Sequence, residues 1–126
     1  MYRLTNIKKN LTQLLKSLPK NPGVYRFLNK NQSPIYIGKA KNLRNRVTQY
    51  FQNLSNKTGK LRSLVEEAEY LELTITNTEL EALLLEQHLI KEFRPKFNVQ
   101  FKDDKGYPWL KIDVSLNIAA ILVTEL

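Results

Sequence analysis

The chain has 126 residues, of which 42% are hydrophobic and 25% are charged, and it contains no cysteine. This length and composition indicate one soluble globular domain, and they exclude disulfides, thiolate metal sites and cysteine nucleophiles. The net charge of +8 favours a polyanionic partner such as nucleic acid or an anionic membrane, and the alternative is a solvated basic surface without a specific partner.

The charge is distributed unevenly along the chain. Residues 1–65 carry fourteen Lys or Arg and no acid, residues 66–86 carry seven Glu and no base, and residues 87–126 are nearly balanced. The first block is therefore predicted to form a surface that binds a polyanion, and the second block supplies carboxylates that can serve at a local site. The sequence contains no signal peptide and no run of about 18 apolar residues, so we expect a cytoplasmic protein without a membrane span.

The N-terminal third predicts a helix followed by a β-hairpin. Apolar residues between Ile7 and Leu18 recur at helical spacing, and Pro19 ends the helix. Two β-prone runs follow at 24–28 and 34–37, joined by turn-forming residues.

This hairpin is expected to bring chemically active side chains together. Tyr25 and Tyr36 fall on its neighbouring strands, and Gly38 and Lys39 open a basic segment. A tyrosine hydroxyl, with a pKa of about 10, acts as a general base at neutral pH only when a cation such as Lys39 or a bound metal assists it. The alternative is that both tyrosines are ordinary strand residues, since strands favour tyrosine.

A second helix is predicted over 43–52, after an N-cap at Asn42. Arg46 lies beside its apolar stripe and one turn from Tyr50. Arg46 is therefore a candidate to bind a phosphate through both of its terminal nitrogens. The alternative is that its aliphatic part packs against the stripe while its guanidinium is solvated. Two further bases on the solvated side of this segment are candidate substrate contacts: Lys41 and Arg44.

The middle of the chain predicts a polar loop over 53–59, a short helix over 61–65 and a strand over 69–76. A long helix then starts near Thr78, where the spacing of a capping box occurs. It ends near Phe93, because a proline follows two residues later.

Glu86 interrupts the apolar stripe of this long helix. Burying an isolated charge costs several kcal/mol, so the carboxylate needs a partner. One partner is a single Mg²⁺ or Mn²⁺ held by this carboxylate, water and a substrate phosphate, and the other is a buried Arg or Lys. A two-metal site usually needs more carboxylates. His88 falls on the polar side of the helix, so a histidine-metal site or a Ser-His-Asp triad has little support.

The C-terminal part predicts a charged turn over 101–108 and a strand over 109–114. An apolar run then stops without a closing turn, which favours an excised domain over a complete short protein. We expect residues 1–126 to form a single domain with a core over about 15–100 and a C-terminal extension over 101–126.

The chain resembles the GIY-YIG nucleases in their paired motif, with Gly23-Val24-Tyr25 followed eleven residues later by Tyr36-Ile37-Gly38. The strings IYIGKAKNLRNRV, TELEALLLEQHLIKEFRPKFNV and KDDKGYPWLKI are similar to the UvrC-type branch of that family, and the likeness spans roughly residues 15–114. The resemblance implies an α/β (α+β) fold, in which helices flank a small central three-stranded antiparallel sheet.

The resemblance also implies a DNA endonuclease that uses one divalent cation, Mg²⁺ or Mn²⁺. In the UvrC-type branch this domain cuts on the 3′ side of a damaged nucleotide after UvrB has marked the site, with UvrA acting upstream. A stand-alone GIY-YIG endonuclease and a non-catalytic DNA-binding module remain as alternatives. The roles implied by motif position are catalysis for Tyr25, Tyr36, Lys39, Arg46 and Asn98, metal binding for Glu86, and substrate contact for Gly38 and Tyr50.

Overall fold

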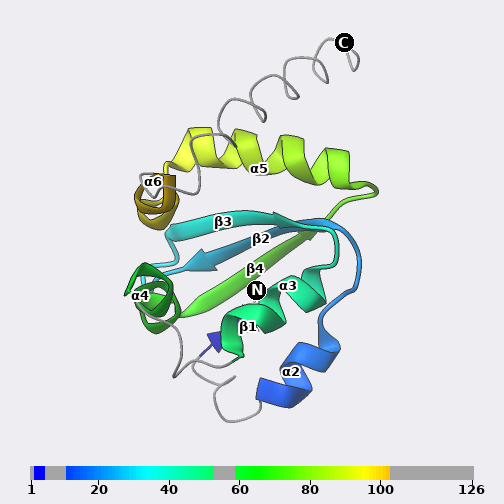
Figure 1. Cartoon of the computed structure of the whole chain (residues 1–126), viewed down its shortest axis with the longest axis horizontal. Helices are drawn as coiled ribbons and strands as arrows, with labels where there is room; N and C mark the ends of the chain where they lie inside the picture. Colours follow the sequence, from blue (N-terminus) through cyan, green and yellow to red (C-terminus); the bar gives the residue numbers. More distant parts are fainter. Residues whose placement is uncertain (1, 5–10, 53–58, 103–126) are drawn as a thin grey trace.

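The computed structural model describes residues 2–4, 11–52 and 59–102 (Figure 1). Three predicted segments lie outside these ranges: the strand over 109–114, the polar loop up to residue 58 and the first turn of the N-terminal helix. The elements are, in order, β1 (Tyr2–Arg3), α2 (Leu11–Ser17), β2 (Gly23–Leu28), β3 (Pro34–Ala40), α3 (Leu43–Phe51), α4 (Gly59–Glu67), β4 (Tyr70–Ile75), α5 (Glu79–Phe93) and α6 (Lys96–Lys102).

An antiparallel sheet flanked by helices is confirmed, but within the described residues it has four strands rather than the predicted three. The strand order is β1-β4-β2-β3, and every neighbouring pair is antiparallel. The additional strand, β1, pairs Tyr2 with Leu71 and Arg3 with Tyr70. Two residues are too few to show the alternation of polar and apolar side chains that identifies a strand in a sequence.

The predicted hairpin is β2 and β3. Its turn is held by the side chain of Asn29, whose Oδ1 accepts from the backbone N of Asn31 at 2.9 Å and of Ser33 at 3.0 Å. The register places Tyr25 opposite Gly38 on β3 and opposite Leu73 on β4. The first signature tyrosine therefore lies on a central strand, and the second lies on the edge strand β3.

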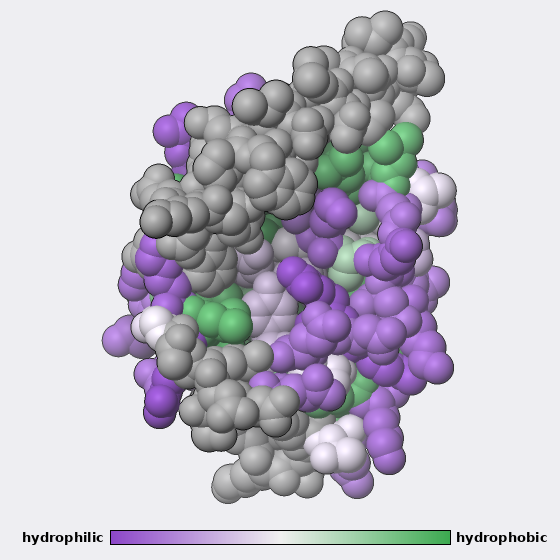
Figure 2. All heavy atoms as spheres, viewed as in Figure 1, coloured by the Kyte–Doolittle hydropathy of each residue, from purple (hydrophilic) through white to green (hydrophobic). Residues whose placement is uncertain are grey.

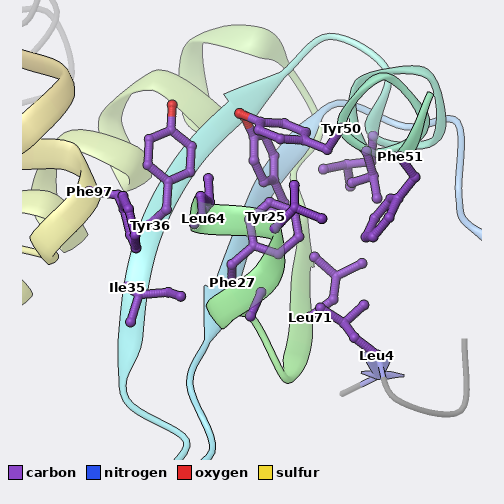
Figure 3. Packing of buried hydrophobic residues seen from close by; sticks show 14 of the residues in the cluster. Leu4, Tyr25, Phe27, Ile35, Tyr36, Tyr50, Phe51, Leu64, Leu71 and Phe97 are labelled. Atoms are coloured by element: carbon purple, nitrogen blue, oxygen red, sulfur yellow. The ribbon is translucent and has the colours of Figure 1, made fainter. Parts of the chain in front are cut away.

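The two faces of the sheet carry different cores because side chains alternate along each strand. One face contributes Tyr25, Phe27 and Tyr36 to a large buried cluster under α3 (Figure 3). On the other face, Val24 and Ile37 pack with Ala82 of α5. Helix α5 thus covers β2 and β3 from the side opposite to α3 (Figure 1).

Helices α3 and α5 begin at the predicted caps. The side chain of Asn42 accepts from the backbone N of Asn45 at 3.0 Å, and that of Thr78 accepts from the N of Glu81 at 3.1 Å. Each cap satisfies one backbone donor that would otherwise have no partner in the first turn of its helix.

Helix α6 was not predicted, because Pro95 was expected to end the helical region. Arg94 ends α5 in the left-handed conformation, with φ at 44°. The chain then turns, and the backbone N of Val99 donates to the O of Pro95 at 3.2 Å. A proline is tolerated at the start of a helix because no helical partner is needed there for its missing N–H.

Two regions of the surface differ in the view of Figure 2. Hydrophilic side chains gather around α3, whereas hydrophobic surface lies over part of α5 (Figure 2). Leu80 of α5 is 41% exposed. None of the helices within the described ranges has the length and apolar character that a membrane span requires.

Candidate active site

Three tyrosines from three elements meet on the sheet face that α3 covers. Tyr25 of β2, Tyr36 of β3 and Tyr50 of α3 lie side by side (Figure 3). The ring centroids of Tyr25 and Tyr36 are 6.1 Å apart, and those of Tyr36 and Tyr50 are 6.2 Å apart. A hydrogen bond of 2.7 Å joins the hydroxyls of Tyr25 and Tyr50. The cluster therefore joins both signature tyrosines to the aromatic position that follows Arg46 by one helical turn.

Arg46 lies at the rim of this cluster. Its Nε donates to the hydroxyl of Tyr25 at 3.4 Å, and its Cζ is 5.8 Å from the centroid of the Tyr50 ring. Its Nη1 also donates to Oε1 of Gln49 at 3.3 Å. The guanidinium is held by these neighbours while the side chain as a whole stays exposed. A cation in such a position is suited to binding a phosphate that approaches from solvent.

Tyr25 is only 1% exposed, and its environment disfavours the phenolate. Burial and the neighbouring Tyr50 raise the pKa of Tyr25 well above its ordinary value, although Arg46 acts in the opposite direction. Tyr25 is therefore a neutral hydroxyl at physiological pH. It orients Arg46 and Tyr50, and it is poorly suited to accept a proton from water.

Gly38 lies directly against the ring of Tyr25. A Cβ atom added at Gly38 would overlap the Tyr25 hydroxyl and ring. The glycine of the second motif is thus required by packing against the tyrosine of the first. Its predicted contact with substrate stays a prediction.

Helix α5 packs against the hairpin, and Glu86 forms a polar contact between them. Its Oε2 accepts from the backbone N of Lys39 at 2.5 Å. Its Oε1 accepts from Nε2 of Gln87 at 2.8 Å. Within the described residues, no ion pair joins Glu86 to an Arg or Lys, so the predicted alternative of a buried salt bridge is not observed. The side chain of Lys39 is exposed on the same edge.

The carboxylate of Glu86 is suited to holding a cation. Burial raises its pKa above the ordinary value, although the hydrogen bonds from Lys39 and Gln87 and the positive charges of Lys39 and Arg46 lower it in part. The described residues contain no group of three or more His, Cys, Asp or Glu side chains that are placed to hold a metal ion together. A metal bound here would take one protein carboxylate, and its other positions would be open to water and to phosphate oxygens.

Asn98 of α6 contacts the backbone of the edge strand. Its Oδ1 accepts from the N of Ile37, and its Nδ2 donates to the O of Ile37, each at 2.8 Å. Ile37 is the central residue of the second motif. Both polar ends of the Asn98 amide are therefore engaged, and the geometry favours a positioning role; direct participation in catalysis stays a prediction.

The two basic residues expected on the solvated side occupy different environments. Lys41 is exposed, and its Nζ lies 3.9 Å from Oε1 of Glu79. Nε of Arg44 donates to the O of Leu18 at 2.7 Å, which ties α3 to the end of α2. Arg44 thus has a structural contact that the sequence did not reveal, and substrate contact by either residue stays a prediction.

A family model described as the UvrC-like GIY-YIG domain matches residues 21–99. The chain belongs to the family of UvrC-like GIY-YIG domains. UvrABC system protein C from Acetivibrio thermocellus is 50% identical over 116 residues, which are 92% of this chain and 19% of that protein. The corresponding protein from Lachnospira eligens is 52% identical over 113 residues, 90% of this chain and 18% of that protein. The chain thus spans about a fifth of the length of these relatives.

The fold of the family is the one seen here. The GIY-YIG N-terminal endonuclease domain of UvrC from Thermotoga maritima, bound to its catalytic divalent cation magnesium, superposes with a TM-score of 0.61 and 43% sequence identity. The match covers 71% of this chain and 96% of that domain. A point variant of the same domain, also bound to its catalytic divalent cation, superposes with a TM-score of 0.60 and 44% identity.

Two glutamines of the site were not identified from the sequence. Gln49 accepts from Arg46, and Gln87 donates to Glu86. Each is close in sequence to the charged residue that it contacts, so the available signal was a glutamine beside a candidate functional charge. That signal is weak, because most glutamines on helices are solvated.

Proposed function

We propose that this chain is the metal-dependent endonuclease domain of nucleotide excision repair, and that it hydrolyses a DNA phosphodiester bond on the 3′ side of a lesion as part of the UvrABC excinuclease. The observation that carries this proposal is the 2.5 Å contact between the backbone N of Lys39 and Oε2 of Glu86. This contact joins the carboxylate on α5 to the strand that carries Tyr36. The proposed partners are damaged duplex DNA and UvrB, with UvrA upstream, and the proposed compartment is the cytoplasm.

Glu86 is the proposed ligand of one Mg²⁺ or Mn²⁺. A cation bound there supplies Lewis-acid polarisation of the scissile phosphate and neutralises charge that develops on it. The fit rests on a partly buried carboxylate without an ion-pair partner among the described residues, with a pKa that burial raises. The cation-bound relatives support the assignment.

The other residues bind the phosphate and handle the proton. Arg46 is placed to bind a phosphate oxygen and to stabilise the negative charge that grows as the oxygen of water attacks phosphorus. The attacking water gives up one proton as the P–O bond to the leaving oxygen breaks. Tyr25 is disfavoured as the proton acceptor by its raised pKa. Tyr36, the other tyrosine of the paired motif, is the proposed proton acceptor and takes the proton in its phenolate form, while the leaving oxygen takes a proton from solvent. Lys39 lies three residues further along β3, where the alternation of side chains directs it to the opposite face of the sheet, so its help in this step stays a prediction.

The experiment replaces the matching 116 residues of the Acetivibrio thermocellus relative with this chain and assays incision of a lesion-bearing duplex with UvrA, UvrB and Mg²⁺. We expect a 3′ incision from the chimera. Glu86→Gln should abolish that incision, because a neutral amide binds a divalent cation far more weakly, while DNA affinity stays within about twofold. Glu92→Gln is the matched control, since Glu92 is exposed on the same helix and pairs with His88.

Two results would contradict the proposal. A chimera that makes only 5′ incisions would show that this chain lacks the assigned activity. Undiminished 3′ incision by Glu86→Gln would show that the chain cleaves DNA without this carboxylate, and therefore that Glu86 is not the metal ligand.

A further inference from the structure

The carboxylate of Glu86 has a hydrogen-bond donor on each of its two oxygens. Oε2 accepts from the backbone N of Lys39 at 2.5 Å, and Oε1 accepts from Nε2 of Gln87 at 2.8 Å. The first donor belongs to a strand and cannot turn away. The second is a side chain, and its contact with Glu86 is partly buried.

Two donors constrain the carboxylate more than one donor does. The last torsion of a glutamate side chain has a broad, roughly two-fold energy profile, so a carboxylate held at one oxygen still rotates about that anchor. A second donor on the other oxygen fixes the carboxylate plane. Each oxygen of an ionised carboxylate has two acceptor positions, so both hydrogen bonds leave room for a cation. Hydrogen bonds of this kind orient metal ligands in many proteins.

We propose that Gln87 is a positioning residue that fixes the Glu86 carboxylate in the orientation in which it binds the divalent cation. This inference rests on the proposed function, because it takes Glu86 to be the metal ligand. Gln87 does not itself touch the metal in this proposal. It acts through the hydrogen bond from its Nε2 to Oε1 of Glu86.

The next residue along α5 provides a matched control. The side chain of His88 is 72% exposed, and its Nε2 lies 3.4 Å from Oε2 of Glu92. His88 and Gln87 are thus neighbours on one helix, and the observed hydrogen bond to Glu86 comes from Gln87. Substitution by methionine weakens the helix at neither position, because the helix propensity of methionine is about that of glutamine and above that of histidine.

The experiment titrates the metal-free chain with Mn²⁺ and follows free Mn²⁺ by electron paramagnetic resonance. We expect Gln87→Met, which keeps the length of the side chain and removes the donor, to raise the dissociation constant about 10-fold. Gln87→Ala should have a similar effect, and it serves as the test if Gln87→Met does not fold. His88→Met should bind Mn²⁺ within about twofold of the parent.

A second measurement needs no metal. Hydrogen exchange of the Lys39 amide reports how firmly Glu86 Oε2 is held, and we expect it to be several-fold faster in Gln87→Met than in the parent. A role for Gln87 in stability alone predicts a lower melting temperature with unchanged Mn²⁺ affinity. That pattern, or an equal loss of affinity in His88→Met, overturns the inference. A parent chain that binds no more Mn²⁺ than Glu86→Gln refutes the proposed function itself.

Discussion

Asn98 takes the place of a neighbouring strand for Ile37. Its side-chain amide accepts from the N and donates to the O of Ile37, each at 2.8 Å, so it completes the hydrogen bonding of a residue on the outer edge of β3. Ile37 lies between Tyr36 and Gly38, and α6 thereby fixes the strand segment that carries the second motif. The short helix that the sequence did not predict is thus the one that anchors this part of the site.

Replacing Asn98 should affect both stability and activity. Asn98→Ala removes both hydrogen bonds to Ile37, and we expect the free energy of unfolding, measured with urea, to fall by about 1–3 kcal/mol. The rate of incision should fall by more than this loss of stability explains, because the position of the Tyr36 side chain depends on the backbone of β3. Asn98→Asp keeps the acceptor for the N of Ile37 but places a charged oxygen against its O, so it should not restore the parent values. Asn45→Ala, at an exposed asparagine of α3, is the control, and an equal response of both alanine variants would exclude a specific role for Asn98.

Gly38 should not tolerate a methyl group. A Cβ atom at this position would overlap the hydroxyl and ring of Tyr25, which is buried. We expect Gly38→Ala to lower the free energy of unfolding by about 1–3 kcal/mol and to change the near-ultraviolet circular dichroism of the tyrosines. A folded Gly38→Ala variant with the parent spectrum and incision rate would show that the packing between the two motifs has no consequence.

The hydroxyl of Tyr25 should stabilise the protein in a way that depends on pH. Burial raises its pKa in the folded protein well above the value of about 10 expected in the unfolded chain. As the pH rises above about 10, the unfolded chain loses the Tyr25 proton while the folded protein keeps it. The free energy of unfolding should therefore decline with pH in this range.

The variant Tyr25→Phe isolates this effect. Near pH 8, Tyr25→Phe should lower the free energy of unfolding by about 1 kcal/mol, because it removes the hydrogen bonds of the Tyr25 hydroxyl with Tyr50 and Arg46. Between about pH 8 and pH 10.5 the difference between parent and variant should shrink, since the variant has no proton to lose at this position. Urea unfolding at several pH values measures the difference, and a constant difference across the range would contradict the raised pKa.

Magnesium should stabilise the chain through Glu86. A ligand that binds only the folded state raises the free energy of unfolding by about 1.4 kcal/mol at ten times its dissociation constant. Protons compete with Mg²⁺ for the carboxylate, and burial raises the Glu86 pKa above its ordinary value of 4.5. The increase in melting temperature with Mg²⁺ should therefore shrink as the pH is lowered from 7 through that raised pKa.

The same raised pKa affects the metal-free protein. Its free energy of unfolding should decline as the pH rises from about 4.5 through the folded pKa of Glu86, because the unfolded chain ionises first.

The stabilisation by Mg²⁺ has its own controls. Added EDTA should restore the metal-free melting temperature. Glu86→Gln should abolish the effect of Mg²⁺, and Glu92→Gln should keep it. A Mg²⁺ effect of equal size in both variants would place the cation elsewhere.

Local patterns in the sequence predicted most of the fold. The hairpin followed from alternation and turn residues, and α3 and α5 followed from their caps at Asn42 and Thr78. Two elements were missed for local reasons. Strand β1 is too short for a periodic signal, and Pro95 was taken as the end of a helical region although it also starts one.

The site was predictable as a set of residue types but not as a set of contacts. Glu86 stood out because a carboxylate interrupts an apolar stripe. Its partner on β3 is the backbone N of Lys39, and a backbone donor has no residue-type signal in a sequence. The same holds for Asn98, whose partners are the backbone atoms of Ile37. Contacts of side chains to backbone across 47 or 61 residues depend on how the helices dock, which only the folded chain specifies.

Within the described residues, each outer edge of the sheet carries a feature that limits its pairing with another chain. One edge is β1, which has only two residues. On the other, the outward backbone groups of Ile37 and the N of Lys39 are occupied by the side chains of Asn98 and Glu86. An uncovered edge strand invites pairing between molecules and aggregation. The side chains of Asn98 and Glu86 thus also cover part of an edge strand, so variants that shorten either of them expose more of this edge and should be stored and assayed dilute.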